Sequence, residues 1–290
     1  MKNQEIKADM LLLLTAIIWG FAFVAQRIGA QYVGAFTFNG IRFAIGSISL
    51  IPLILYFNRK SKESTEKVDT EKQKISVGAW QGGAIAGCAL FMAASLQQIG
   101  LSYTSVGKAA FITGLYMVIV PLLGILLKQH VNISTWMGVA LAVVGLYFLS
   151  ITENFSISKG DLIELVGAVF WSIHILTIDH FVKKVDALKL SFVQFITCSI
   201  LSMIVALIFE KITINGLTQA IIPILYGGIC SVGIAYTLQV VGQKHAKPSH
   251  AAIILSLEAV FAAIGGLLIL HENLGGRGYL GCGLMLSGML

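Results

Sequence analysis

The chain has 290 residues, of which 57% are hydrophobic and 12% charged, with a mean hydropathy of +0.85 and a formal net charge of +6. Soluble domains carry about 25% charged residues, so this composition excludes an ordinary soluble protein. Apolar runs of roughly 18–25 residues recur along the chain, long enough to cross a bilayer as helices, and they lack the alternation of barrel strands. The sequence therefore predicts an all-α integral membrane protein.

Ten candidate helices lie between the polar breaks of the chain. The first, approximately 10–28, is too long for the apolar region of a signal peptide and has no clear cleavage site after it, so we expect it to be retained. The others are expected at approximately 35–57, 77–101, 104–127, 132–151, 161–182, 187–209, 217–242, 248–270 and 277–290. The last run is short, so it is either a short terminal helix or one that continues past Leu290.

The distribution of the 20 Lys and Arg residues predicts the orientation of the chain. If the N-terminus is cytoplasmic, most of them lie on the cytoplasmic side, many in a loop of about 58–76 that contains NRKSKESTEKVDTEKQK. The positive-inside rule then favours both termini in the cytoplasm, and we expect a bacterial cytoplasmic membrane. The positive charge would face anionic lipid, so no nucleic-acid partner is expected.

The cysteines and the other reactive residues give no sign of metal, disulfide or enzyme chemistry. Cys88, Cys198, Cys230 and Cys282 fall inside apolar runs without a CxxC pair, and we expect them to pack as small buried hydrophobes. The chain has no intramembrane acid pair and no HExxH motif. We therefore predict neither a cofactor nor an intramembrane enzyme.

Two blocks of the chain are repeated. At an offset of 142 residues, Gln97-Gln-Ile-Gly100 and Ala109-Ala-Phe-Ile112 match Gln239-Val-Val-Gly242 and Ala251-Ala-Ile-Ile254. At an offset of 152 residues, Asp9, Trp19 and Arg42-Phe43 match Asp161, Trp171 and Gln194-Phe195. The long loop of about 58–76 accounts for the difference between the two offsets.

Each repeat would hold five helices, one copy in residues 1–151 and the other in residues 160–290. Because five is odd, the second copy would enter the membrane from the opposite side, and a pseudo-two-fold axis in the membrane plane would relate the halves. Many secondary transporters are built in this way, with the substrate site near the midplane between the halves. The sequence thus predicts ten transmembrane helices, arranged as two inverted five-helix repeats.

A series of short motifs occurs in order along the chain: Ala16-Ile-Ile-Trp19-Gly20, Asn39-Gly-Ile-Arg42-Phe43-Ala44, Tyr103-Thr-Ser-Val-Gly-Lys-Ala-Ala-Phe111 with Pro121, Leu257-Glu-Ala-Val-Phe-Ala262 and His271-Glu-Asn273. Together they resemble the ten-helix EamA-type branch of the drug/metabolite transporter superfamily, over essentially the whole chain. That family commonly has Glu-Pro-Val in its ninth helix, and Ala259 replaces the proline here, which leaves a kink there without its usual cause. The resemblance implies a proton-coupled or facilitative carrier of small metabolites, often an exporter of amino acids or related compounds.

Glu258 is the first candidate site residue, because it is the only charged residue in the run Ile253–Gly266. A charge at the centre of a membrane helix costs roughly 2.5–3.5 kcal/mol on insertion scales. Small residues on the same helical stripe predict that it faces the helix bundle. Glu258 is then either a protonated group that holds helices together or a cavity group that binds a substrate amine or carries a proton. Tyr116 is its repeat mate, and is either a core aromatic or faces the same cavity.

Four further residues are substrate-site candidates. Trp19 and Trp171 are repeat mates at mid-membrane, and either pack between helices or form an aromatic floor to the cavity. Arg42 either snorkels towards the membrane surface or pairs with a substrate carboxylate. His174 is either a hydrogen-bonded core histidine or a proton-coupling group. The remaining charged groups near the ends of spans are expected at the membrane surface: Lys108, Glu164, Asp179, His180 and His250.

We therefore expect a secondary active transporter of small metabolites such as amino acids, working by alternating access around a midplane cavity in the lipid bilayer. Export is the favoured direction, protons are a candidate coupling ion, and the protein is a monomer or a homodimer. A nucleotide-sugar or organophosphate carrier is the alternative within the superfamily, although phosphate calls for several basic cavity residues and only Arg42 and Lys108 are available. A channel or a non-enzymatic sensor is the alternative from another class.

Overall fold

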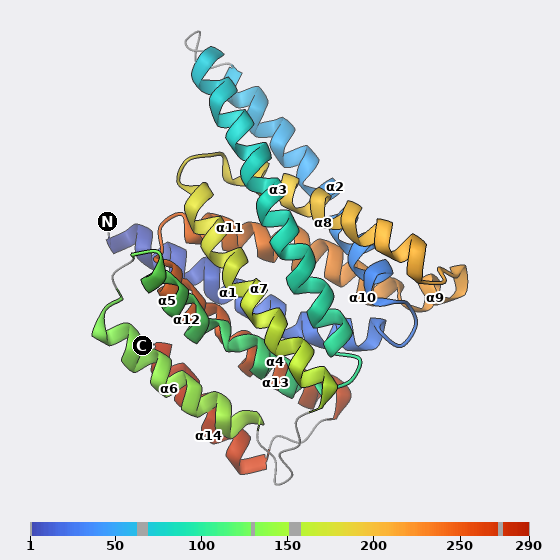
Figure 1. Cartoon of the computed structure of the whole chain (residues 1–290), viewed down its shortest axis with the longest axis vertical. Coiled ribbons are helices and arrows are strands. Elements are labelled where there is room, and N and C mark those ends of the chain that lie inside the picture. The colour runs from blue at the N-terminus through green and yellow to red at the C-terminus, as the bar shows by residue number, and fades with distance from the viewer. Residues whose placement is uncertain (1, 63–68, 129–130, 151–157, 272–274, 290) are drawn as a thin grey trace.

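The structure, a computed structural model, is made of helices (Figure 1). It describes residues 2–62, 69–128, 131–150, 158–271 and 275–289, and no strand is formed within these ranges. Eight helical segments are long and apolar enough to cross a membrane. The prediction of an all-α integral membrane protein is confirmed.

Residues 2–150 fold into six labelled helices. They are α1 (Lys2–Gly29), α2 (Ala35–Lys62), α3 (Asp69–Gly100), α4 (Val106–Gly114), α5 (Tyr116–Leu126) and α6 (Ile133–Ser150). The segment that we expected as one helix over 104–127 is divided into α4 and α5. The apolar part of α6, Ile133–Gly145, is shorter than the membrane-capable segments.

The described residues of 158–289 form the remaining elements, with more interruptions. The elements are α7 (Lys159–Val182), α8 (Ala187–Phe209), α9 (Ile214–Gln219), α10 (Ile221–Leu225), the π-helix η1 (Tyr226–Tyr236), α11 (Thr237–Gln243), α12 (Pro248–Ser256), α13 (Glu258–Leu270) and α14 (Gly275–Met289). The predicted helices over 217–242 and 248–270 are therefore each divided. Among the described residues, eight of the ten predicted spans meet the criteria of length and hydropathy, and those at 132–151 and 277–290 do not.

The helices begin at polar residues that satisfy their first N–H groups. Ser158 and Asp161 form a capping box at the start of α7, each side chain accepting from the other's backbone N–H. The side chain of Asp186 accepts from the Lys189 N–H at the start of α8. Pro248 opens α12, where its missing N–H costs nothing.

Two of the breaks share one backbone conformation. Leu115 separates α4 from α5 and Leu257 separates α12 from α13, and both have φ −61° and ψ −13°. At each break the leucine N–H bonds the carbonyl three residues back, at 3.1 Å and 3.2 Å, so one turn is tightened. The break at Leu257 forms although Ala259 replaces the proline, so the kink does not depend on a proline at that position.

Glycines let α1 and α2 approach the second half of the chain closely. A Cβ atom on Gly20 of α1 would lie 2.3 Å from the Cβ atom of Phe261 on α13. A Cβ atom on Gly46 of α2 would lie 2.2 Å from Val232 on η1, and one on Gly228 would lie 2.7 Å from Ile45. Since no other residue fits these contacts, the glycines fix how α1 and α2 dock.

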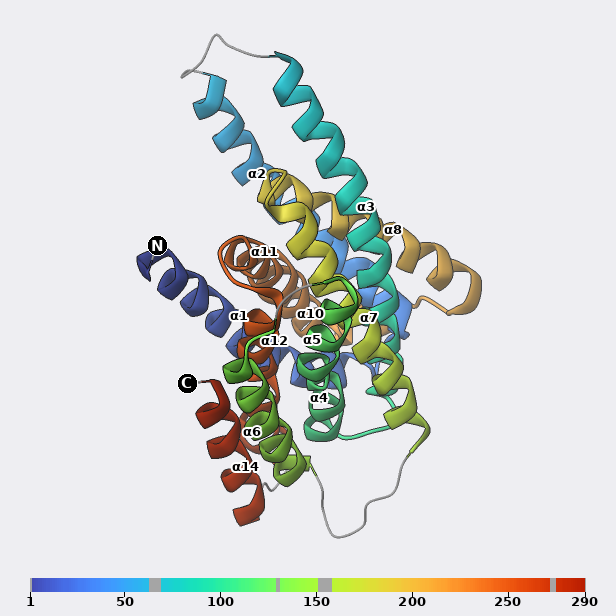
Figure 2. The same ribbon diagram turned by 60° about the vertical axis from the view of Figure 1, so that its left-hand side comes forward.

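The helices surround a common centre. Two views show α2 and α3 projecting together at one end, while α6 packs on α14 at the other (Figures 1 and 2). Between them lie α1, α7, α11 and the broken pairs, with α4 packed on α13 and α5 packed on α12. This arrangement brings the residues beside both breaks to the middle of the bundle.

Candidate functional site

The two breaks in the helices position the central acid and its partner. Tyr116 is the first residue of α5 and Glu258 the first residue of α13. The Tyr116 hydroxyl donates to Glu258 Oε1 at 2.9 Å, and both side chains are buried. Glu258 thus faces the helix bundle, as the small residues on its stripe predicted.

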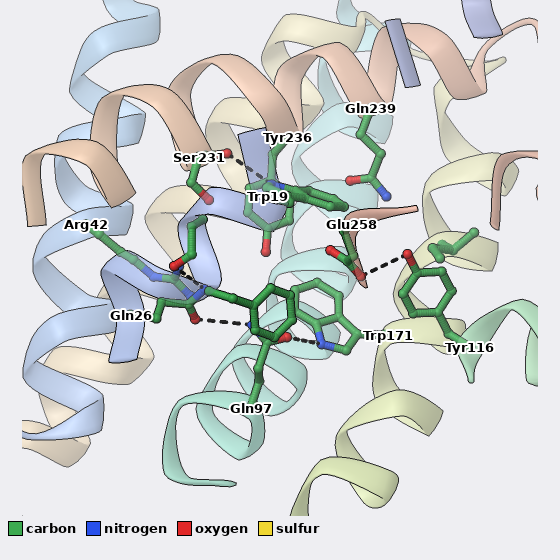
Figure 3. Close-up of a pocket in the computed structure, with 13 residues that line it drawn as sticks. Trp19, Gln26, Arg42, Gln97, Tyr116, Trp171, Ser231, Tyr236, Gln239 and Glu258 are labelled. Carbon is green, nitrogen blue, oxygen red and sulfur yellow. Dashed lines mark hydrogen bonds between the residues drawn. The ribbon is translucent and has the colours of Figure 1, made fainter. Parts of the chain in front are cut away.

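A small pocket lies between the two halves of the chain (Figure 3). Its volume is about 20 Å³, which is room for about one water molecule. Most of its walls come from residues that are related by the repeat. These pairs are Trp19 and Trp171, Phe23 and Ile175, Gln97 and Gln239, and Tyr116 and Glu258.

An aromatic cluster forms one side of this pocket. The ring centroid of Tyr236 lies 4.5 Å from that of Trp19 and 6.1 Å from that of Trp171, and the two tryptophan rings are 6.3 Å apart. Trp19 Nε1 donates to the Ser231 carbonyl at 3.3 Å, and Trp171 Nε1 donates to Gln97 Oε1 at 2.9 Å. The tryptophans therefore both pack between helices and line the pocket, so the two interpretations offered for them are not exclusive.

Glutamines supply most of the neutral polar groups of the pocket. Gln97 Nε2 donates to Gln26 Oε1 at 3.2 Å, which continues the chain of hydrogen bonds from Trp171. Gln239 is the repeat mate of Gln97, yet its Oε1 and Nε2 atoms are buried without a hydrogen-bond partner among the described residues. Unsatisfied buried amides are costly, so Gln239 is available to a ligand.

Arg42 lines the same pocket from α2. Its side chain is 1% exposed, so it does not snorkel to the membrane surface as one interpretation held. Its Nε donates to Asn39 Oδ1 at 3.0 Å, and its guanidinium lies 4.9 Å from the centroid of the Phe43 ring. Its Nη2 atom has no hydrogen-bond partner within the described part of the chain.

The pocket thus holds one basic and one acidic side chain that do not pair with each other. Glu258 is 4% exposed, and no ion pair joins it to Arg42 among the residues that the structure describes. In Figure 3 the two side chains lie on opposite sides of the aromatic cluster, with Trp19 and Tyr236 between them. A small molecule that carries both charges could bridge them.

His174 is the one candidate outside the pocket lining. Its buried ring packs edge-on against Trp171 and Tyr236, and its Nε2 atom lies 2.8 Å from Gln194 Oε1. His174 therefore packs against the aromatic cluster without lining the pocket. No group of three His, Cys, Asp or Glu side chains able to hold a metal ion occurs in the described ranges.

Other expectations about buried groups were wrong. Glu164 and Asp179 are buried between helices, although their places near helix ends predicted the membrane surface. Cys88 is exposed and Cys230 half-buried, whereas only Cys198 is a fully buried thiol. The side chain of Cys282 lies outside the described residues. Depth along a helix can be read from a sequence, but the face on which a residue lies depends on packing.

Tyr236, Gln239 and Gln26 were not predicted as site residues. Gln239 entered the sequence analysis only as part of the repeated pattern. The signal that could have identified it is an amide inside an apolar span, and the structure shows that this amide is buried without a partner among the described residues. Tyr236 lies on η1, where the π-helical turn shifts side chains away from the positions that an α-helical pattern predicts.

Comparison with known proteins places the chain among transporters. The family described as the EamA-like transporter family matches residues 6–151 and 158–290. An uncharacterized transporter of Archaeoglobus fulgidus is 32% identical over 292 residues, covering 99% of this chain and 86% of that protein. The uncharacterized transporter YoaV of Bacillus subtilis is 24% identical over 275 residues, covering 93% of this chain and 90% of that protein.

The fold also resembles that of a protein known from a crystal structure. The TM-score is 0.75 at 17% sequence identity, and the match covers 97% of this chain and 94% of the other. At this identity the likeness concerns the fold alone.

Proposed function

The chain belongs to the EamA-like transporter family and is an integral membrane protein, and from this premise we propose that it carries small zwitterionic metabolites such as amino acids. The transport is secondary and alternates access between the two membrane faces, with export as the favoured direction. We place it in a bacterial cytoplasmic membrane with both termini in the cytoplasm, as a monomer or homodimer that converts no substrate chemically.

The observation that carries this proposal is that the pocket holds a basic and an acidic side chain that are not paired with each other. Arg42 has a free Nη2 atom that suits a carboxylate, and Glu258 suits an ammonium group. The buried charge of Arg42 is costly without an anion, and Glu258 is stable as a carboxylate only beside a cation, so a ligand with both charges matches both side chains. An amino-acid backbone has these two groups on adjacent carbons.

The rest of the pocket is suited to the other parts of such a ligand. The rings of Trp19 and Tyr236 lie between the two charged residues, where an aromatic face can attract an ammonium group. The free amide of Gln239 offers both a donor and an acceptor. The walls contributed by Phe23 and Ile175 are apolar and suit a hydrophobic side chain.

The small size of the pocket supports alternating access. A volume of about 20 Å³ holds one water molecule and no amino acid. The structure is therefore a closed state, and a substrate enters only when the helices around the pocket separate. Such opening of two halves around a fixed site is the usual mechanism of secondary transporters.

Several features support two inverted five-helix repeats over residues 1–151 and 160–290. The matched breaks at Leu115 and Leu257 have the same backbone angles. The first part of the broken pair in one half packs on the second part of the other, α4 on α13 and α5 on α12, so the two segments run antiparallel. An inverted repeat predicts this crossing, and a repeat inserted twice in the same direction does not.

Matched charge pairs close the two ends of the pathway in this proposal. On one side Lys108 Nζ lies 2.6 Å from Asp161 Oδ2, and on the other His250 Nε2 lies 3.1 Å from Asp9 Oδ1. Each pair joins the start of a broken helix to an aspartate of α7 or α1. The residues of the two pairs are repeat mates, so each pair can serve as the closure of one membrane face.

The rival carriers are less well supported. A nucleotide sugar or organophosphate needs several cations around its phosphate, and Arg42 is the sole Lys or Arg lining this pocket among the described residues. Lys108 is bound to Asp161 and does not line it. A channel would need an open path, whereas the structure is closed at its centre.

Counterflow in proteoliposomes tests the proposal. The purified protein, preloaded with unlabelled neutral L-amino acids, should take up the labelled compounds saturably, which a channel or sensor would not do. We expect Arg42→Gln and Glu258→Gln each to lower this exchange by roughly tenfold or more, the equivalent of about 1.4 kcal/mol of lost binding. Arg277→Gln changes an exposed arginine of α14 and is the control. Undiminished exchange in both pocket variants would exclude the zwitterion site.

A further inference from the structure

A second acid is buried in the bundle outside the pocket. Glu164 on α7 is 0% exposed and does not line the pocket. Its Oε2 atom accepts from the Thr113 hydroxyl at 3.1 Å, and its Oε1 atom has no hydrogen-bond partner among the described residues. Neither the substrate site nor the closure of either membrane face uses this carboxyl group.

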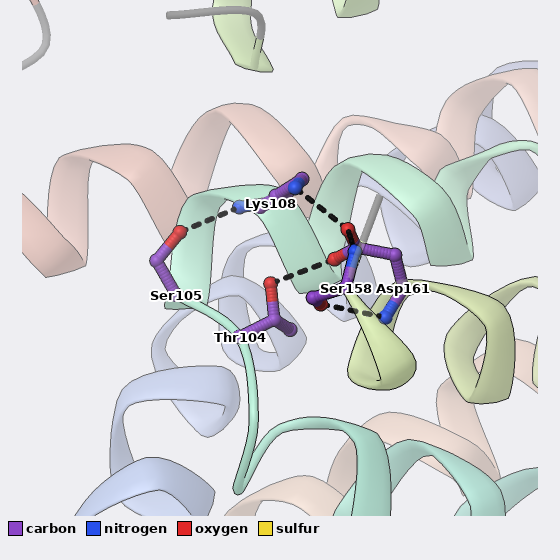
Figure 4. A network of polar contacts seen from close by, with 5 residues as sticks. All are labelled: Thr104, Ser105, Lys108, Ser158 and Asp161. Atoms are coloured by element: carbon purple, nitrogen blue, oxygen red, sulfur yellow. Dashed lines mark hydrogen bonds and ion pairs between the residues drawn. The ribbon is translucent and has the colours of Figure 1, made fainter. Parts of the chain in front are cut away.

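No ion pair joins Glu164 to a Lys, Arg or His side chain in the described part of the chain. Asp161 and Glu258 are the acids close enough to act on it electrostatically. Asp161 is bound by Lys108 and by the Thr104 hydroxyl at 3.0 Å, in the network of Figure 4. Helix α3 presents Gly100 to this carboxyl group, where an added Cβ would lie 2.8 Å from Glu164 Oε1.

This environment suits a carboxyl group that carries a proton. An ionised carboxylate buried without a cation costs several kcal/mol, and the cost disappears when a proton is bound. Once protonated, Glu164 can donate to Thr113 and keep one hydrogen bond. Glu164 has one hydrogen-bond donor, the Thr113 hydroxyl, and its Oε1 atom has no partner among the described residues. These contacts fit the neutral acid better than the anion.

The hydroxyl groups next to the break connect Glu164 to the pocket. Thr113 bonds Glu164, and Tyr116 bonds Glu258. Thr113 and Tyr116 are three residues apart on either side of Leu115, which is about one helical turn. Asp161 lies one turn from Glu164 on α7, towards the closure formed with Lys108. Polar groups thus follow one another, about one helical turn apart, from the membrane face at Asp161 to the substrate pocket.

We propose that Glu164 is a second proton-binding site, which exchanges protons with Glu258 through Thr113 and Tyr116 and so couples proton movement to transport. The proposal rests on the function proposed above. Glu164 first loses its proton towards Asp161 while that face of the membrane is open. When the substrate ammonium group then binds Glu258, the proton of that carboxylic acid leaves for the Glu164 carboxylate. Glu258 is then ionised and Glu164 neutral, and the two hydroxyl groups regain the protons that they pass on. Glu164 later releases its proton towards Asp161 when that face opens.

The repeat shows that this acid occurs in only one of the two halves of the chain. The repeat mate of Glu164 is Leu12 on α1, which packs on Gly242 as Glu164 packs on Gly100, its own glycine mate. Beside the closure formed by Asp9 and His250, the same helix packing therefore occurs with a leucine in place of the acid. Protons are bound beside one closure of the pathway and not beside the other, which gives the coupling a direction.

Infrared difference spectroscopy of the lipid-reconstituted protein tests proton binding without any substrate. As the pH is raised, the wild type should lose the C=O stretching bands of two protonated carboxyl groups. Glu164→Gln and Glu164→Leu should remove one band and Glu258→Gln the other, while Thr113→Val should shift only the Glu164 band. Glu210→Gln is the control, because that carboxylate caps α2 through the N–H groups of Phe36 and Thr37 and should contribute no band. Spectra in which Glu164→Gln removes no band would overturn the proposal.

Transport in proteoliposomes then tests the coupling, with the neutral L-amino acids as the probe. Glu164→Gln should abolish uptake driven by a pH gradient. Its counterflow, measured at a pH high enough that Glu258 is already ionised, should stay within about twofold of wild type, because exchange then needs no proton transfer to Glu164. Retention of pH-driven uptake, or an equal loss of both activities, would refute the coupling role. A wild type without counterflow would instead count against the proposed function, and the infrared spectra alone would then decide whether Glu164 binds a proton.

Discussion

Tyr116, Glu258, Gln97 and Gln239 are two pairs of repeat mates at the centre of this protein, and the two pairs differ in how they are bonded. Tyr116 and Glu258 occupy equivalent positions in the two halves and bond each other directly at 2.9 Å. Gln97 is fully engaged by Trp171 and Gln26, whereas its mate Gln239 has no partner among the described residues. Positions related by the repeat therefore carry different chemistry on the two sides of the pocket.

At the residue scale, Tyr116→Phe should show what the bond to Glu258 contributes. The variant leaves a buried carboxyl group without its donor, so we expect the free energy of unfolding to fall by about 1–3 kcal/mol. Thermal unfolding in detergent measures this, and the pH profile of amino-acid counterflow should change as well.

Tyr226→Phe is the matched control for this substitution. Its hydroxyl donates to the Ile18 carbonyl at 3.0 Å from a half-buried position, so its loss should cost less and leave the pH profile unchanged. Equal effects of the two variants would mean that the Tyr116 hydroxyl matters only for packing.

At the element scale, the break between α12 and α13 should accept a proline. Ala259 is the second residue of α13, in the first turn, whose N–H groups have no acceptor within that helix. Ala259→Pro should therefore leave folding and counterflow within about twofold of wild type, because proline is tolerated in a first turn.

Ala263→Pro is the contrasting variant, since it falls inside α13 and removes a helical hydrogen bond. It should destabilise the protein by about 3 kcal/mol or more. Size-exclusion profiles and unfolding temperatures distinguish the two variants. If Ala259→Pro proved as damaging as Ala263→Pro, the tightened turn at Leu257 would not be a true helix start.

Some of the helices and site residues could be predicted from the sequence, and others could not. Apolar runs predicted the membrane helices well, because burial in lipid requires long hydrophobic segments whatever their packing. The division of α12 from α13 was not predicted, because no proline marks it. Glu164 was predicted at the membrane surface, because its position along α7 says nothing about the face that packs on α3 and α4.

The candidates Glu258, Tyr116, Trp19, Trp171 and Arg42 do meet in one pocket, since four of them form repeat pairs across its centre.

At the scale of the whole molecule, the two closures should be separable by matched substitutions. Lys108 and Asp161 are 23% and 7% exposed, whereas His250 and Asp9 are 47% and 40% exposed. Buried ion pairs are costly to break by removing one partner, and exposed pairs contribute about 0–1 kcal/mol. We therefore expect Lys108→Gln to open its membrane face more than His250→Gln opens the other.

Thiol labelling of the pocket measures this opening. Ser231→Cys, in a background without the four natural cysteines, places a reactive group in the pocket lining. A membrane-impermeant reagent added on the face closed by Lys108 and Asp161 should label Lys108→Gln faster than the protein without that substitution. Added on the face closed by His250 and Asp9, it should label His250→Gln faster too, but by a smaller factor. Identical labelling of both variants from both sides would contradict the assignment of the pairs to opposite faces.

The paired helices α2 and α3 have a practical consequence for imaging. Their membrane-capable parts are Ala35–Phe57 and Gly78–Gly100, yet the helices themselves run on to Lys62 and back to Asp69. A protein of 31.2 kDa embedded in a detergent micelle gives electron micrographs little to align on. A rigid fusion domain spliced into both helical extensions, or an antibody fragment raised against them, would stand clear of the micelle and supply the orientation mark that the rest of the particle lacks.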